Sequence, residues 1–222
     1  MMGPHLQFGP AMPRKRFLAS KIWPYHVSAR CINREWFHLP IDHVWNIFSL
    51  HLYFAHHAFG LQIHSFVLMD NHFHMIVSTP DANLDEIMNY FMREVSKSIA
   101  RDSGRINQTF GGPYYWSLLQ SPHYYLCAYK YVYRNPVEAG LIERSEDYPY
   151  STLYGLKGSS HIIIPVHNDE TFFSDPNGTL IWLNNSYPNQ AKEMIRNALR
   201  KKEFKFGLDK DRKPNILETV LV

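Results

Sequence analysis

Two histidines, His72 and His74, are separated by a single phenylalanine. In a β-strand, residues i and i+2 point to the same face, so both imidazoles would project together while Phe73 turns to the other side. Two imidazoles at this spacing can bind one divalent metal ion. The same spacing also occurs where two histidines merely occupy a polar pocket. Such pairs are common in a chain with 13 histidines, and we expect His56-His57 to be a pair on a helix surface.

A second group of candidate residues lies in the Tyr-Val-Tyr-Arg-Asn-Pro segment that starts at Tyr131. On a helix, Tyr131 and Asn135 are four residues apart and share one face. A phenol is a poor nucleophile near its usual pKa of about 10, but a neighbouring cation or metal ion favours the phenolate. The side-chain oxygen of Asn135 could complete the protein ligands of that metal. The alternative is an aromatic helix packed on a sheet, which we expect of Tyr125, Tyr129 and Tyr133.

These side chains need strands and helices to position them. Apolar alternation and β-branched residues predict strands over residues 25–31, 61–69, 72–79 and 114–119. Apolar residues at helical spacing predict helices over 41–57, ending near Gly60, and from Asp81 or Asn83 to about Gly104. A third helix is expected from Pro122 to Asn135, where Pro136 would stop it.

The resulting order is β-α-β-β-α-β-α. Without its last helix, this order is the ferredoxin-like split βαβ arrangement, an α+β fold in which helices cover one face of an antiparallel sheet. That fold hosts many functions and does not decide between them.

The chain divides into three parts. Residues 1–21 are expected to form a flexible basic arm that includes Arg14, Lys15 and Arg16. Residues 22–155 form the domain with the candidate site, and residues 156–222 form a C-terminal extension after a plausible linker at 158–160. In the extension, 179–184 is expected to be a short strand or helix, and 189–204 a basic helix.

Positive charge is concentrated in residues 190–213, although the net charge of the whole chain is only +3. This stretch has nine lysines and arginines and four acidic residues, a local net charge of +5. It is either a solvated helix face or a segment that binds phosphates. In the second case we expect it to hold DNA outside the catalytic pocket, through Arg196, Arg200, Lys201 and Lys202.

The two cysteines, Cys31 and Cys127, are far apart and lack CxxC spacing. This fits a reducing compartment and no disulfide framework. No apolar run approaches 18 residues, and the first residues lack the apolar region of a signal peptide. We therefore expect a cytoplasmic protein that is neither exported nor bound to membranes.

The segments VLMDNHFHMIV and YKYVYRNPVEAGLIERSEDYPYSTLYG together closely resemble the single-tyrosine HUH transposases, the IS200-like family. Within that family they are similar to the REP-associated tyrosine transposases, whose motif reads Tyr-hydrophobic-x-x-Asn-Pro-Val-x-Ala-Gly-Leu before Asp-Tyr-Pro-x-Ser-Ser. The matching residues are Tyr131, Val132, Asn135, Pro136, Val137, Ala139, Gly140, Leu141, Asp147, Tyr148, Pro149 and Ser151. The resemblance covers about residues 13–155, and YHVSAR is similar to the family's first strand.

The resemblance implies a role for each candidate residue. Tyr131 is the nucleophile, His72 and His74 are metal ligands, and Asn135 stands where related insertion-sequence enzymes have a glutamine ligand. The cofactor is Mg²⁺ or Mn²⁺. The substrate is single-stranded or hairpin DNA at repeat sequences, which is cut and transposed through a 5′-phosphotyrosine link. The chain would act as a monomer or a homodimer, because REP-associated enzymes act as monomers while related insertion-sequence enzymes are dimers that exchange tyrosine helices.

Two alternative functions remain open from the sequence. The first is a non-catalytic nucleic-acid-binding protein that derives from a transposase and keeps its fold. Replacement of the tyrosine by phenylalanine, or loss of one histidine of the pair, would favour this alternative, and neither change is seen. A metal-dependent hydrolase would use the histidine pair with an activated water. That enzyme would need more acidic ligands, and Asp70 is the only carboxylate near the pair in sequence.

Overall fold

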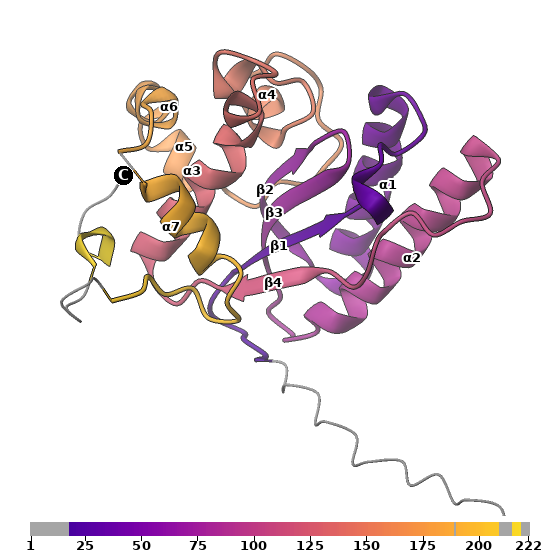
Figure 1. Cartoon of the computed structure of the whole chain (residues 1–222), viewed down its shortest axis with the longest axis horizontal. Helices are drawn as coiled ribbons and strands as arrows, with labels where there is room; N and C mark the ends of the chain where they lie inside the picture. Colours follow the sequence, from indigo (N-terminus) through magenta and orange to yellow (C-terminus); the bar gives the residue numbers. More distant parts are fainter. Residues whose placement is uncertain (1–17, 189, 209–214, 219–222) are drawn as a thin grey trace, which may run out of the picture.

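The computed structural model describes residues 18–188, 190–208 and 215–218. Its centre is a four-stranded antiparallel sheet with the strand order β2-β3-β1-β4 (Figure 1). The strands are β1 (Tyr25–Arg30), β2 (Gln62–Leu68), β3 (His72–Ser78) and β4 (Tyr115–Leu118). All four predicted strands are confirmed, as is the α+β class. Antiparallel pairing places residues that lie opposite each other on the same face of the sheet.

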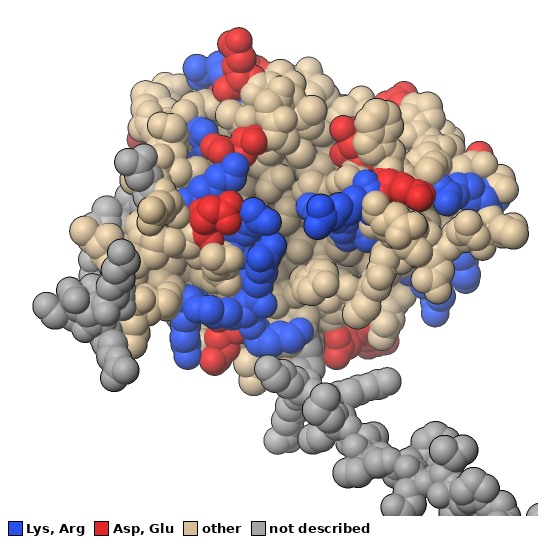
Figure 2. Space-filling model, in the orientation of Figure 1, with Lys and Arg blue, Asp and Glu red and all other residues tan. Residues whose placement is uncertain are grey.

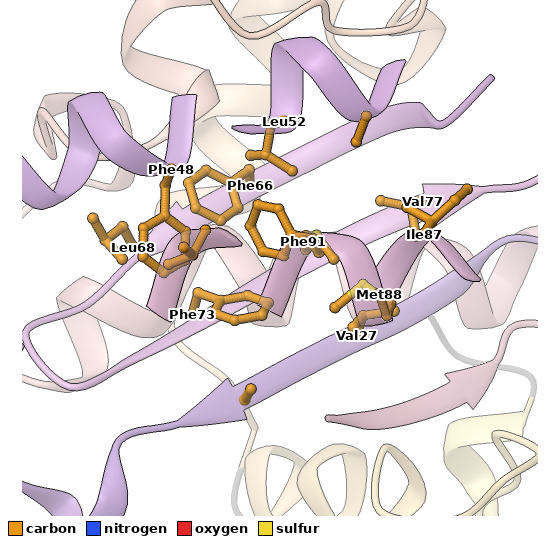
Figure 3. Packing of buried hydrophobic residues seen from close by; sticks show 14 of the residues in the cluster. Val27, Phe48, Leu52, Phe66, Leu68, Phe73, Val77, Ile87, Met88 and Phe91 are labelled. Atoms are coloured by element: carbon orange, nitrogen blue, oxygen red, sulfur yellow. The ribbon is translucent and has the colours of Figure 1, made fainter. Parts of the chain in front are cut away.

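One face of the sheet is covered by the two long helices α1 (Ile41–Phe59) and α2 (Leu84–Ser103). Their apolar sides pack with every second residue of the strands around a group of phenylalanines (Figure 3). The helix α1 ends as predicted at Gly60, whose φ of 71° is a left-handed conformation that glycine adopts without strain. This face therefore follows the pattern that the sequence predicts.

The opposite face is covered by α3 (Pro122–Glu138) and by the C-terminal part of the chain (Figure 1). The prediction of helices on one face therefore holds for α1 and α2, whereas the whole molecule has helices on both faces. The remaining helices are α4 (Thr152–Leu156), α5 (Glu170–Phe173), α6 (Pro176–Asn184) and α7 (Ala191–Ala198), with short 3-10 turns η1 (Ile32–Arg34), η2 (Ser145–Asp147) and η3 (Ile216–Glu218). The segment 179–184, left open between strand and helix, belongs to α6.

The prediction that Pro136 stops α3 is wrong. The helix continues for almost one more turn, because Ala139 still donates its backbone N–H to the carbonyl of Asn135 at 3.1 Å. Proline has no amide hydrogen, so the helix loses one internal hydrogen bond at this position. The buried position of Pro136 within the packed helix allows the helix to tolerate that loss.

The basic helix α7 is shorter than the predicted 189–204. It ends at Ala198, and the following residues run beside β4, where Leu118 donates its N–H to Lys202 O and accepts from Phe204 N–H. The backbone groups of this segment therefore form hydrogen bonds with the edge of the sheet and not within a longer helix.

The other edge of the sheet, at β2, is also closed by later parts of the chain. Leu68 donates its N–H to Tyr150 O, Phe66 donates to the Thr152 hydroxyl, and His167 donates to Ile63 O. Within the described ranges, no helix is long and apolar enough to span a bilayer.

Candidate functional site

The candidate residues meet on the sheet face that is covered by α3. His72 and His74 lie on this face of β3, and their ring centres are 5.1 Å apart. Tyr131, from the middle of α3, has its ring centre 5.4 Å from that of His74, with the two rings perpendicular. Two segments far apart in the sequence therefore bring the predicted nucleophile to the predicted metal ligands.

Each histidine uses its Nδ1 atom to contact the protein. His72 Nδ1 is 2.7 Å from the side-chain oxygen of Asn71, in the turn before β3. His74 Nδ1 is 2.9 Å from Nε2 of His26, which comes from β1. Metal-binding histidines usually hold one ring nitrogen in such a hydrogen bond, which leaves the other nitrogen for the metal. The Nε2 atoms of His72 and His74 are therefore the candidate donors.

Sequence reasoning missed His26, although the signal was present in the strand. Alternation along β1 places His26, Ser28 and Arg30 on the face of the histidine pair, because Ser28 lies opposite His74 and Arg30 opposite His72. His26 is almost fully buried, and its Nδ1 atom has no hydrogen-bond partner among the described residues. The ring is therefore placed to orient His74 rather than to meet solvent.

Burial keeps the three imidazoles neutral. It lowers the pKa of His26 to about 3, and together with the positive charge of Arg30 it lowers the pKa of His72 to about 4. The pKa of His74 is also well below its ordinary value, because of burial and then its His26, His72 and Arg30 neighbours. A neutral imidazole is the form that binds a metal ion, so the rings need not lose a proton first.

Asn135 lies between the histidine pair and the tyrosine. Its side chain lines the same groove as both groups and interacts with the His72 ring and with the Tyr131 phenol, which is four residues earlier on the same face of α3. The structure therefore brings all four predicted residues together. The amide can supply an oxygen donor to a metal or orient the phenol.

Tyr131 is in an environment with opposing effects on its acidity. Burial raises the pKa of its phenol above the usual value, whereas the charges of Arg196 and Arg200 and the Asn135 hydrogen bond lower it. The two arginines come from α7 and from the residues that follow it. This helix belongs to the C-terminal extension, so the extension contributes directly to the surroundings of the tyrosine.

A groove of about 810 Å³ runs over these residues. Its lining includes the histidine pair, Tyr131 and Asn135, together with Arg30 and Arg34. Basic residues of the C-terminal extension also line the groove, namely Lys192, Arg196 and Arg200. Figure 2 shows lysine and arginine side chains on both sides of a hollow in this face. The expectation that the basic segment lies outside the catalytic pocket is therefore corrected, because its helix forms one wall of the groove.

The predicted DNA-binding residues have different positions. Arg196 and Arg200 line the groove, but Lys201 and Lys202 do not. Lys201 donates to the carbonyl of Lys205, and the Lys202 ammonium lies 4.1 Å from the centre of the Trp116 ring. The arm residues Arg14, Lys15 and Arg16 lie outside the described residues.

The donor set fits a divalent metal with open coordination positions. Two neutral imidazoles and the Asn135 amide line the same groove, and in the described ranges no group of three or more His, Cys, Asp or Glu side chains is arranged to hold a metal ion. A site with few protein ligands leaves positions for water and for oxygens of a substrate. Phosphate oxygens are suitable ligands for Mg²⁺ and Mn²⁺.

Comparison with known proteins agrees with the fold and identifies the family. A solved structure, described as a REP-associated tyrosine transposase bound to a REP hairpin, is similar with a TM-score of 0.55 and 18% identity, over 71% of this chain and 93% of that one. At this identity the likeness shows a shared fold. No curated protein matches the chain.

The family model for IS200-like transposases matches residues 23–137, a segment that contains the histidine pair, Tyr131 and Asn135. Because this segment covers more than half of the sequence, the chain belongs to the IS200-like transposase family.

Proposed function

We propose that the chain cleaves and rejoins single-stranded DNA, with Tyr131 as the covalent nucleophile and a divalent metal bound by His72 and His74. The observation that carries this proposal is the meeting of a tyrosine, two neutral imidazoles and an amide in one basic groove. Membership of a transposase family supports DNA as the substrate. The basic sides of the groove provide the electrostatic attraction that a nucleic-acid backbone needs.

The proposed reaction exchanges one phosphodiester for another. The phenol of Tyr131 loses its proton and its oxygen attacks the phosphorus, so that a bond to the 5′-phosphate of the downstream strand forms. The bond from phosphorus to the 3′ oxygen breaks, and that oxygen takes up a proton. A 3′-hydroxyl can later attack the phosphotyrosine and reverse these changes, which joins strands without an external energy source.

The residues of the chain have separate tasks in this reaction. Asn135 orients the phenol, since its amide interacts with Tyr131 from one helical turn away, and the basic residues of the groove hold the backbone of the strand. His72 and His74 would hold a Mg²⁺ or Mn²⁺ ion, with Asn135 as a further oxygen donor. When bound, the ion supplies stabilisation of negative charge on the phosphate oxygens.

We further propose a hairpin repeat as the natural target and a monomer as the active form. The similar solved structure is described as bound to a REP hairpin, which supports the first point. Both sheet edges are closed by the chain itself, and the tyrosine helix packs on its own strands, which supports the second. A single-stranded segment suits the groove because its backbone and bases are accessible.

The test uses single-stranded oligonucleotides that tile the DNA flanking the gene for this chain, each labelled at the 3′ end. With Mg²⁺ or Mn²⁺, we expect a labelled protein adduct that survives denaturation, and none with EDTA. Tyr131→Phe should lose the adduct but bind the strand within a few-fold of the unmodified chain. As a matched control, Tyr53→Phe removes a hydroxyl from an exposed tyrosine of α1 and should keep full activity.

An adduct formed by Tyr131→Phe would contradict the assignment of the nucleophile. Binding without any adduct, for every oligonucleotide and both metals, would favour a non-catalytic nucleic-acid-binding protein derived from a transposase.

A further inference from the structure

The helix α7 is divided into a buried side and a charged side. Ala191, Ile195, Ala198 and Leu199 pack into the apolar cluster beneath α3. On the other side, Lys192, Arg196 and Arg200 follow each other at intervals of four residues, which places them in one row along a helix. All three line the groove that contains Tyr131. The row therefore faces the reaction site and not bulk solvent alone.

Charged contacts fix this row relative to the tyrosine helix. Glu138 lies on α3 one turn beyond Asn135, and it also lines the groove. One of its oxygens is 2.8 Å from the Lys192 ammonium, and the other is 2.7 Å from Arg134. Together with the buried residues of α7, the Lys192–Glu138 ion pair holds the arginines in a defined position beside Tyr131.

The two arginines differ in the contacts that they already make. Arg196 is paired with Glu193 at 2.9 Å, and about half of each side chain is exposed. Arg200 is exposed and makes no hydrogen bond or ion pair with any residue that the structure describes. A guanidinium group has five N–H donors in a planar fork that matches phosphate oxygens. Arg200 therefore has its donors available for a ligand in the groove.

We propose that Arg196 and Arg200 bind the phosphate group that Tyr131 attacks, so that the C-terminal extension completes the cleavage site. This inference rests on the proposed function and adds two residues that lie outside the segment matched by the family model. Both arginines line the same groove as Tyr131, so a phosphate at the phenol oxygen would lie in a groove that also contains the two guanidinium groups. Their role is to offset negative charge as it builds on the phosphate and on the phenol oxygen.

The first test measures the rate of the chemical step at saturating DNA, in a single turnover, with the most efficiently cleaved oligonucleotide and Mn²⁺. We expect Arg200→Gln and Arg196→Gln to slow adduct formation by roughly 10²-fold each, the usual effect of removing one donor from a developing anion. Arg200→Lys should recover part of the rate because it keeps the charge but not the fork. Arg93→Gln removes an equal charge from an exposed site on α2 and should have no effect.

The second test identifies which phosphate the arginines contact. In the Tyr131→Phe background, binding is measured for oligonucleotides that carry one neutral methylphosphonate at successive linkages. If the proposal holds, the affinity penalty of Arg200→Gln disappears when the linkage that the unmodified chain cleaves is neutral, and persists for all other linkages.

The outcomes separate this inference from the proposed function. Unchanged rates at saturating DNA, or a penalty that disappears only at a linkage away from the cut, would show that the arginines merely bind the flanking strand and would overturn the inference. In that case the unmodified chain still forms its adduct, so the proposed function stands. If the unmodified chain forms no adduct, the proposed function fails first and the inference fails with it.

Discussion

The two faces of the sheet bury different kinds of side chain. On the face of α1 and α2, the side chains that the strands contribute are apolar, and phenylalanines such as Phe48, Phe66 and Phe73 pack edge to face or stacked (Figure 3). On the face of α3, the same strands contribute His26 and His74, and α3 itself buries Lys130 and Arg134. Strands β1 and β3 thus place apolar side chains on one face of the sheet and histidine rings on the other.

Polar groups buried on the α3 face cost free energy unless they find partners. Lys130 is 1% exposed, and its ammonium lies 5.4 Å and 5.3 Å from the ring centres of Trp182 and Tyr187. Burial and then the charge of Arg134 lower its pKa to about 8. Both faces bury an apolar cluster, but only the α3 face combines its cluster with the histidines and Tyr131 of the proposed site.

The largest effect should come from removing an imidazole on the α3 face. We expect His72→Ala and His74→Ala each to reduce metal-dependent adduct formation by more than about 10²-fold. Loss of a residue that only orients a metal ligand costs up to about 10²-fold, and loss of the ligand itself should cost more. The free energy of unfolding should change far less than the activity. Adduct formation by either variant at the unmodified rate in EDTA would contradict the metal site and the comparison.

Phe73 lies between the two histidines in sequence, and its side chain is on the face covered by α1 and α2. A substitution of Phe73 therefore tests the role of that face. Its fully buried ring packs against Phe48 and Phe91, so Phe73→Ala should lower the free energy of unfolding by about 3–5 kcal/mol. Chemical denaturation measures this change. The fraction that stays folded should still form the adduct at a normal rate, and a specific loss of rate in folded protein would show that the faces are not separate.

His26→Phe should have an intermediate effect, because it keeps a ring but removes the Nε2 contact with His74. We expect metal affinity, measured by calorimetry with Mn²⁺, to fall by about 10–100-fold. Ser28→Ala, a small change on the same strand face, is the control. Unchanged affinity in His26→Phe would mean that the orientation of His74 comes from packing alone.

The smallest effect is expected for Asn135→Ala. The variant loses the amide that interacts with the His72 ring and the Tyr131 phenol, and an interaction worth about 1 kcal/mol corresponds to roughly a five-fold change in rate. Adduct formation should therefore slow by about five-fold but remain measurable. A loss as complete as that of His72→Ala would instead identify Asn135 as an essential metal ligand.

The sequence predicted the regular elements well because their signals are local. Alternation defined the strands, apolar residues at helical spacing defined α1 and α2, and both glycine ends were found at Gly60 and Gly104. The histidine pair and Tyr131 could also be singled out, because strand and helix periodicity fix which side chains share a face. Their mutual distance was not predictable from periodicity, since it depends on how α3 packs across the sheet.

The errors all involve long-range packing. Pro136 is a local signal for the end of a helix, but it is buried and α3 continues past it. The residues after α7 form backbone hydrogen bonds with Leu118 and therefore do not extend the helix. The row formed by Lys192, Arg196 and Arg200 was visible in the sequence as an interval of four, but its placement beside Tyr131 required the tertiary structure. Charge alone indicated that the segment was basic and could not show what it faced.

The closed sheet edges also have a consequence for how the protein is made. A ribosome delivers the four strands before the segments around Tyr150, His167 and Glu203 that cover the edges. Until those segments emerge, both edges offer unpaired backbone groups to other chains, a hazard for aggregation. The helix α7, which lines the groove, emerges between the segments around His167 and Glu203, so the nascent chain should acquire protection of the β4 edge and a complete groove at nearly the same stage.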